Sequence, residues 1–388
     1  MKKVLSILLS VAMIVLCFAA CGKTDGDKSS TGKAANVKVG SIFLHDENST
    51  YDKNFITAAE EACKKAGVEI LKKTNISETQ ACYDAAAELV DEGCNVIFAD
   101  SFGHEPYVIQ AAKKFPEVQF LHATGTKAHT EGLSNYHNAF ASIYEGRYLA
   151  GVAAGMKLNE MISSGKITAD KAKMGYVGAY TCAEVISGYT SFYLGAKSVC
   201  PSVTMEVTFT GSWYDETAEK EAAQKLINNG CVLISQHADS MGAPTACEAA
   251  GVPNVSYNGS TVSACRNTFI VSSRIDWAPY LEYAIDCVKN GKAIDTDWTG
   301  TLSTGSVVLT DVNTKAAAEG TQAKIDEVKA ELESGKLHVF DTSAFTVTVS
   351  DSKNKNATVD ADGHLTGYKA DIDSDADNTG DTEVVSDG

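Results

Sequence analysis

"ETQACYDAAAELVDEGCNVIFADS" (residues 78–101) and "ETAEKEAAQKLINNGCVLISQHADS" (residues 216–240) follow one pattern. Each stretch begins with Glu-Thr, continues as an Ala-rich amphipathic segment, reaches Gly-Cys, and ends in an apolar run followed by Asp-Ser. The amphipathic segment has helical spacing, and the short apolar run is typical of a buried strand. The repeat therefore indicates two copies of one α/β arrangement within the 388-residue chain.

The surroundings of both stretches extend the repeat. "VKVGSIFL" (residues 37–44) begins the first copy, and "KMGYVGAY" (residues 173–180) begins the second. The first copy predicts helices over 54–66, 78–92 and 107–115, alternating with strands over 68–71, 95–99 and 119–123. Strands that alternate with helices predict right-handed βαβ units and a parallel sheet. The expected fold class is α/β, with two lobes that are each a parallel sheet flanked by helices.

The remaining segments complete a prediction of the domain organisation. Helices are expected over residues 144–157, after the first lobe, and over 275–292, crossing back after the second. The predicted division is a signal peptide (1–20), a lipid-anchored flexible linker (21–36), an N-terminal lobe (37–140), a linking helix region (141–160), a C-terminal lobe (161–272), a crossover helix with closing segments (273–350) and an acidic tail (351–388).

The N-terminus indicates export. "MKK" precedes an apolar run that ends in small residues, and Cys21 follows in "FAACGK". This order is typical of a secretory signal. A Cys after two alanines also resembles a bacterial lipoprotein box, in which the Cys becomes the lipidated N-terminus. We therefore expect a lipid anchor at Cys21, with an ordinary cleaved signal as the alternative.

The charge distribution limits the possible partners. The formal net charge is −17, so phosphate backbones would repel the chain and nucleic acid is not expected as a partner. Residues 360–388 hold nine Asp and Glu against one Lys and are expected to be largely disordered. "DADGHLTG" and "DIDSDADN" in this tail lack the Glu that completes a calcium loop, so calcium binding is not predicted.

Nine cysteines would remain after signal removal and lipidation of Cys21. An odd number cannot pair completely, and no CxxC spacing occurs among them. Most lie beside Ala, Val or Gly, where Cys acts as a small apolar residue. Buried thiols are the favoured interpretation, with one or two disulfides as the alternative.

Polar and aromatic side chains collect in the loops that follow the predicted strands. In open parallel sheets, ligands bind beyond the carboxyl ends of the strands, so these loops should meet at a cleft. No metal-ligand spacing, nucleophile elbow or Walker loop occurs among them, so neither a metal site nor a catalytic residue is predicted. Flat rings together with fixed polar groups suit a planar heterocycle. The residues that we expect at the ligand are Asp46, Tyr51, Phe55, Phe102, Glu184, Trp213, Gln236, Asp239, Ser240, Asn258 and Trp277.

Six motifs in order resemble one protein family. They are "VIFADSFGHEP", "FLHATG", "IYEGRYLAGVAAG", "AEVISGYTSFYLGAKSVCP", "GSWYDETAEKEAAQKLINNG" and "ISQHADSMGAP". Over residues 37–311 the chain resembles the basic membrane protein family, substrate-binding lipoproteins of ABC importers that include purine nucleoside receptors. The resemblance implies the two-lobed periplasmic-binding-protein type I fold.

The resemblance also implies residue roles. Asp46 and Phe55 match the family's Asp and its base-stacking Phe nine residues later, and Phe55 and Trp213 are expected to sandwich a purine. The chain departs from the family where Ile56 follows Phe55 in place of Asn, a position tied to sugar binding. Arg274 also stands where a related subgroup has Trp, which bears on ligand choice.

The implied function is a receptor without a cofactor. It would capture a nucleobase or nucleoside on the extracytoplasmic face of the cell membrane and deliver it to ABC permease subunits. Two alternatives remain open at this point. One is a ligand sensor that signals to a membrane partner, and the other is a nucleoside hydrolase.

Overall fold

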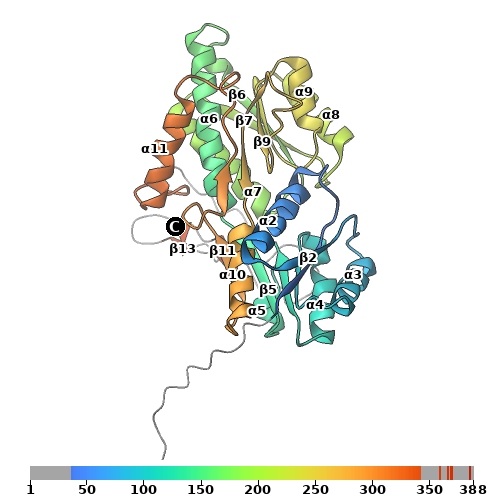
Figure 1. Cartoon of the computed structure of the whole chain (residues 1–388). Coiled ribbons are helices and arrows are strands. Elements are labelled where there is room, and N and C mark those ends of the chain that lie inside the picture. The colour runs from blue at the N-terminus through green and yellow to red at the C-terminus, as the bar shows by residue number, and fades with distance from the viewer. Residues whose placement is uncertain (1–35, 342–357, 360–364, 367, 370–383, 386–388) are drawn as a thin grey trace, which may run out of the picture. The chain divides into compact units, whose positions relative to one another are not determined.

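The computed structural model describes residues 36–341 and four two-residue strands, as Figure 1 shows. In these strands Thr358–Val359 (β13) pairs with Leu365–Thr366 (β14), and Tyr368–Lys369 (β15) pairs with Val384–Val385 (β16), both antiparallel. The predictions of a signal peptide, a lipidated Cys21 and its linker lie outside the described residues, as does most of the acidic tail. Among the described residues, no helix has the length and apolar character needed to cross a bilayer.

The first sheet has six strands, all parallel to their neighbours. In spatial order they are β11 (Asp297–Gly300), β5 (Tyr136–Ala141), β4 (Gln119–Ala123), β3 (Val96–Ala99), β1 (Lys38–Ile42) and β2 (Glu69–Lys73). Because successive side chains of a strand point to opposite faces, β3 sends Val96 and Phe98 to one face and Ile97 and Ala99 to the other. The first face packs against α2 (Thr50–Ala66) and α10 (Ala278–Lys289), and the second against α3 (Gln80–Asp91) and α4 (Glu105–Lys114).

The second sheet repeats this arrangement. Its strands are β12 (Val307–Leu309), β10 (Phe269–Ile275), β9 (Asn254–Tyr257), β8 (Leu233–His237), β6 (Lys173–Gly178) and β7 (Thr204–Phe209), with only β12 antiparallel to its neighbour. One face packs against α6 (Ile143–Ser163) and α7 (Ala183–Val199), and the other against α8 (Glu216–Asn228) and α9 (Gly242–Ala250). α11 (Thr321–Glu333) packs on α6. The predicted α/β fold with two parallel-sheet lobes is confirmed.

Local chemistry explains why the two quoted stretches fold alike. The Thr79 and Asp215 side chains accept backbone N–H groups at the starts of α3 and α8. Gly93 and Gly230 follow these helices with φ values of 88° and 89°, a left-handed conformation that favours glycine. Each glycine turns the chain into the next buried strand, β3 or β8.

The chain passes between the lobes three times, between β5 and α6, between β10 and α10, and between β11 and β12. The sequence predicted helices over 144–157 and 275–292 at two of these passages, and the structure has α6 and α10 there. α6 packs tightly against α7, because a Cβ on Gly151 would lie 2.0 Å from the Phe192 carbonyl oxygen. The expected strand assignments missed β5, β10, β11 and β12.

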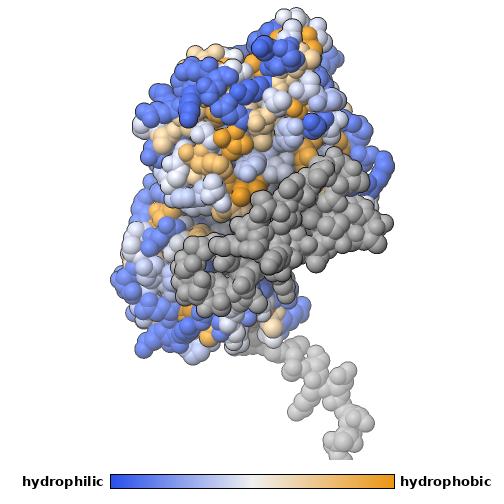
Figure 2. All heavy atoms as spheres, turned by 180° about the vertical axis from the view of Figure 1, so that it is seen from behind, coloured by the Kyte–Doolittle hydropathy of each residue, from blue (hydrophilic) through white to orange (hydrophobic). Residues whose placement is uncertain are grey.

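None of the nine cysteines in the described part of the chain forms a disulfide, and all of them except Cys182 are buried. The prediction of buried thiols is thus confirmed for eight positions. On the face shown in Figure 2, hydrophilic residues cover most of the coloured surface and hydrophobic residues form small patches.

Candidate functional site

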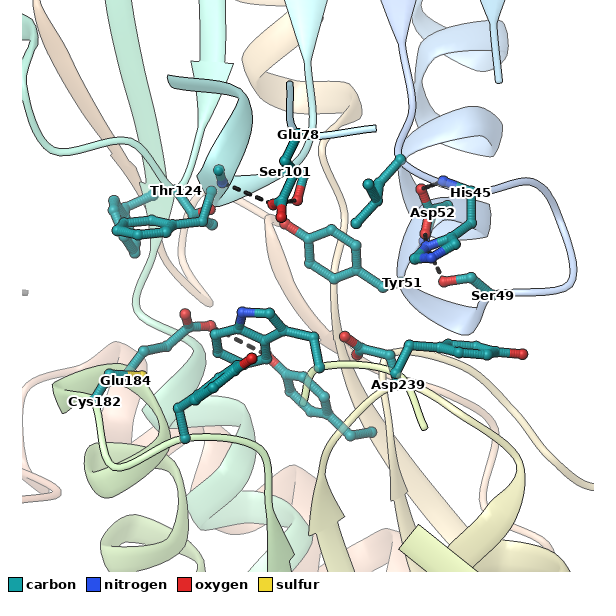
Figure 3. Close-up of a pocket in the computed structure, with 18 of the residues that line it drawn as sticks. His45, Ser49, Tyr51, Asp52, Glu78, Ser101, Thr124, Cys182, Glu184 and Asp239 are labelled. Carbon is teal, nitrogen blue, oxygen red and sulfur yellow. Dashed lines mark hydrogen bonds and ion pairs between the residues drawn. The ribbon is translucent and has the colours of Figure 1, made fainter. Parts of the chain in front are cut away.

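A cavity of about 630 Å³ lies where loops at the strand ends of both lobes face each other (Figure 3). This volume is within the range of about 300–1,000 Å³ that is typical of small-molecule sites. The first lobe lines it with Leu44, His45, Ser49, Tyr51, Asp52, Glu78, Ser101, Phe102, Gly103, Thr124, Thr126 and Phe140. The second lobe lines it with Tyr180, Thr181, Cys182, Glu184, Trp213, Tyr214, Asp239 and Tyr257.

The start of α2 positions the first group of polar side chains. Ser49 caps the helix by accepting the Asp52 N–H, and the Asp52 carboxylate accepts the His45 backbone N–H at 2.7 Å. The His45 ring nitrogen Nδ1 lies 3.2 Å from the other Asp52 oxygen. Burial alone would raise the pKa of Asp52, but these hydrogen bonds outweigh it and lower the pKa. Asp52 therefore presents a charged carboxylate at the cavity, and the same contact raises the pKa of His45.

A second carboxyl group lies behind this one. Asp100 is fully buried at the end of β3 and accepts the Leu44 N–H at 3.1 Å. Burial, together with the nearby charge of Asp52, raises the pKa of Asp100 well above its usual range. Asp100 therefore holds a proton more readily than Asp52 does, and its backbone oxygen accepts the Tyr51 hydroxyl at 2.6 Å. This bond holds the Tyr51 ring against the cavity wall.

Glu78 forms the far end of the first-lobe wall. Its carboxylate accepts the Ser101 hydroxyl at 2.6 Å and the Gly103 N–H at 2.8 Å. A Cβ on Gly103 would lie 2.4 Å from the Glu78 carboxyl carbon, so a larger residue at this position would displace the Glu78 side chain. Glu78 immediately precedes the N-cap of α3 and is fixed there by groups from the β3–α4 loop.

On the second lobe, Glu184 lies in the first turn of α7, where the helix dipole favours a carboxylate. The Tyr257 hydroxyl donates to Glu184 at 3.4 Å, and the His237 ring nitrogen Nε2 lies 3.5 Å from the same oxygen. The His237 and Tyr257 rings contact each other at a centroid distance of 4.1 Å. The Tyr257 hydroxyl therefore holds Glu184 at the cavity, and the His237 ring lies beside it.

Asp239 is the second carboxylate from this lobe and is only 7% exposed. It accepts the Asn258 amide at 2.8 Å, and its backbone N–H donates to the Trp213 carbonyl. Burial, followed by the charge of Glu219, raises the pKa of Asp239 well above its usual range. A ligand that donates N–H groups here would stabilise the charged form.

The two lobes contact each other beside the cavity. The Thr50 hydroxyl of α2 donates to the Asp239 backbone oxygen at 3.0 Å. The Asn54 amide lies 3.4 Å from the Asn258 side-chain oxygen, and the His45 and Tyr214 rings lie 5.2 Å apart. The lobes are thus joined by weak polar and aromatic contacts that a closing motion can make or break.

The cavity lining combines negative charge with aromatic surface. Four carboxyl groups reach it, and among its described lining residues there is no Lys or Arg. Such a lining suits a neutral or cationic ligand with N–H or O–H donors and disfavours phosphate or carboxylate groups. Among the described residues, no cluster of three or more His, Cys, Asp or Glu side chains could hold a metal ion.

The structure brings five of the predicted ligand residues to the cavity and places six elsewhere. Tyr51, Phe102, Glu184, Trp213 and Asp239 line it. Phe55 and Trp277 are buried and stack on each other at 4.7 Å. The remaining four do not line it: Asp46 accepts from Asn48, Gln236 donates to backbone oxygens, the Ser240 hydroxyl accepts the Gly242 N–H, and Asn258 supports Asp239.

Several lining residues were not among the predicted ones, notably His45, Asp52, Glu78 and Thr124. Asp52 carried a sequence signal, because Ser followed three residues later by an acidic residue marks a helix start. Thr124 has a φ of 63°, which is uncommon for a non-glycine residue. No sequence pattern predicted this backbone conformation.

Comparison with known proteins assigns the chain to a family. Residues 39–336 match the family model Bmp, described as ABC transporter substrate-binding protein PnrA-like. The chain belongs to this family. The predicted family resemblance is therefore confirmed, and Bmp proteins are substrate-binding proteins rather than enzymes.

Three relatives of this Bmp protein are informative. A purine-binding protein of Brucella abortus is 29% identical over 78% of the chain and 83% of its own length. A putative glucose-binding protein of Haloferax volcanii is 30% identical over 65% of the chain and 60% of its own length. The nucleoside-binding protein BmpA of Lactococcus lactis is 24% identical over 64% of the chain and 68% of its own length.

Solved structures support the fold of this Bmp protein. An ABC transporter solute-binding protein from Conexibacter woesei superimposes with a TM-score of 0.64 at 21% identity, covering 78% of this chain and 97% of that one. At this level of identity the similarity concerns the two-lobed architecture alone.

Proposed function

We propose that this Bmp protein captures a purine-type ligand, a nucleobase or nucleoside, in the cavity between its lobes and delivers it to the permease of an ABC importer. The observation that carries the proposal is the lining, in which aromatic rings from both lobes accompany four carboxyl groups, and none of the described lining residues is Lys or Arg. The names of the Brucella and Lactococcus relatives support the same ligand class.

The rings suit a flat heterocycle. Tyr51 from the first lobe and Trp213, Tyr180 and Tyr257 from the second border the cavity. Stacking on aromatic rings contributes about 1–3 kcal/mol per base. The Tyr51 hydroxyl donates to the Asp100 backbone oxygen, and the Trp213 ring makes an edge contact with Tyr180, so each ring has a partner within the protein.

The carboxyl groups suit the edges of such a ligand. Purines carry ring N–H and amino donors, and nucleosides add sugar hydroxyls, all of which Asp52, Glu184 and Asp239 can accept. Nucleotides carry phosphate, which these carboxylates would repel. The proposed ligand is therefore unphosphorylated.

The proposed location follows from the family and the N-terminus. A Bmp receptor works on the extracytoplasmic face of the membrane, and we propose that a lipid on Cys21 anchors it there. Closure of the lobes over the ligand would give the form that the permease recognises.

Isothermal titration tests the proposal. The ligands are adenine, guanine, hypoxanthine and xanthine, their nucleosides, the matching 5′-monophosphates, and D-glucose, which is included because of the Haloferax relative. We expect binding of at least one base or nucleoside, with the monophosphate about tenfold weaker or worse, a difference of ~1.4 kcal/mol. Binding of glucose without any purine would overturn the ligand class and leave the receptor fold intact.

A further inference from the structure

Arg147, on the crossing helix α6, is fully buried within the second lobe. Its guanidinium nitrogens donate to the Ser235 hydroxyl at 2.6 Å, the Ser256 backbone oxygen at 3.1 Å and the Ser273 hydroxyl at 3.2 Å. These partners belong to β8, β9 and β10. Arg147 thus reaches from the helix across the face of the second sheet.

This buried charge has no carboxylate partner among the described residues. The rings of Phe192, Tyr176 and Tyr257 surround it, with centroids 4.9, 5.3 and 5.6 Å from the guanidinium carbon. Within the described part of the chain, its Nε atom has no hydrogen-bond partner. A buried cation without a counter-ion is costly, and apolar residues of similar size often pack as well or better. The fold alone therefore gives little reason for an arginine here.

The aromatic cage connects Arg147 to the cavity. Tyr257 contacts the guanidinium with its ring and donates its hydroxyl to Glu184. Tyr176 contacts the same guanidinium, and its hydroxyl lies 3.4 Å from His237 Nδ1. The other nitrogen of His237 faces Glu184 at 3.5 Å. Both routes from Arg147 end at the same carboxylate, which lines the cavity.

Titratable and charged groups from four elements surround the His237 ring. The groups that face its ring are Tyr176 of β6, Glu184 of α7, Tyr257 of β9 and, beyond the tyrosines, Arg147 of α6. Burial lowers the pKa of His237, Glu184 raises it, and Arg147 lowers it. Neutral His237 then leaves Glu184 without a salt bridge, whereas a protonated ring would pair with it.

We propose that Arg147 is a positioning residue of the ligand site, acting through Tyr257 and His237 to keep Glu184 available to the ligand. This inference rests on the proposed function, because it takes Glu184 as a ligand contact. Arg147 does not line the cavity, and its guanidinium contacts the ring of Tyr257, which does.

A double-mutant cycle separates this role from a merely structural one. Arg147→Met should raise the Kd of the tightest purine of the titration panel about tenfold in the wild-type background, within the range of coupling found for connected residues. In the Glu184→Gln background the same substitution should change Kd by about twofold or less. Equal losses in both backgrounds would overturn the proposal. Arg147→Lys should recover most of the affinity, and Arg266→Met, at an exposed arginine, is the matched control.

A second measurement needs no ligand. NMR titration of the His237 ring in the ligand-free protein should show its midpoint rising by about one pH unit in Arg147→Met, since a nearby charge shifts a pKa by about that much. Arg147→Gln, which keeps donors without charge, should give the same rise if the Met variant does not fold. An unchanged midpoint would overturn the proposal. If no purine binds while the midpoint still rises, the proposed ligand fails and the Arg147–His237 coupling stands.

Discussion

Trp213→Ala and Phe55→Ala should affect different properties, ligand binding and fold stability respectively, although both rings are predicted from the sequence to stack on the ligand. Trp213 is half-buried and lines the cavity. Phe55 is fully buried, with ring centroids 4.7 Å from Trp277 and 5.6 Å from Phe98. Trp213→Ala is therefore expected to weaken binding while the fold persists, and Phe55→Ala to weaken the fold itself.

The magnitudes follow from these positions. Loss of one stacking ring costs about 1–3 kcal/mol, which corresponds to a rise in Kd of roughly 5- to 150-fold for Trp213→Ala. Truncation of a buried Phe costs about 3–5 kcal/mol of folding free energy. At about 2–4 °C per kcal/mol for a domain of lobe size, Phe55→Ala should lower Tm by roughly 6–20 °C.

The assay pairs isothermal titration against the tightest purine of the panel with thermal melting in the absence of ligand. Phe209→Ala is the matched control, because that ring is 38% exposed and lies outside the cavity lining. It should leave Kd unchanged and lower Tm by less than Phe55→Ala does. The reasoning is refuted if Phe55→Ala keeps its Tm and loses affinity, or if Trp213→Ala binds as tightly as the wild type.

Four further predictions test other parts of the account. Burial raises the pKa of Glu219 from 4.5 to about 7, so the stability linked to it is complete below pH 4.5 and is lost as the pH rises through about 7. Glu219→Gln should therefore flatten the fall in Tm between about pH 4.5 and about pH 7, and an unchanged slope would contradict this assignment. Cys182 is the described cysteine that is not buried, so a maleimide should label it first, and a bound purine should slow the labelling seen by peptide mass mapping. A Cβ on Gly195 would lie 2.0 Å from the Tyr148 carbonyl oxygen, so Gly195→Ala should cost about 1–3 kcal/mol in denaturant unfolding. Cys21→Ala should release the protein from washed membranes into the soluble fraction, and retention would place the anchor elsewhere.

The fold could be predicted from the sequence because its signals are local and occur twice. The capping residues, the glycines that end α3 and α8, and the apolar strands that follow them each specify their own conformation. β5 escaped prediction because it carries buried polar residues. His137 and Asn138 are polar and do not have the hydropathy typical of a buried strand. His137 is nevertheless buried, because its ring nitrogens form hydrogen bonds with Gln119 and the Asp295 carbonyl oxygen.

The candidate site could be predicted only in part, since loop position does not determine where a side chain points. Phe55 and Tyr51 lie one helical turn apart on α2, yet Tyr51 faces the cavity while Phe55 packs under Trp277. Glu78 is held at the cavity by hydrogen bonds from Ser101 and Gly103, which lie more than twenty residues away in the sequence. Such contacts arise from tertiary packing.

The central claim is that the cavity between the lobes holds an unphosphorylated purine. The most direct measurement is mass spectrometry of the ligand that co-purifies with the protein from rich medium, released by denaturation and quantified against protein. The account predicts a nucleobase or nucleoside, approaching one per chain and lost in Trp213→Ala. A hexose, an amino acid or a nucleotide in that place would contradict it.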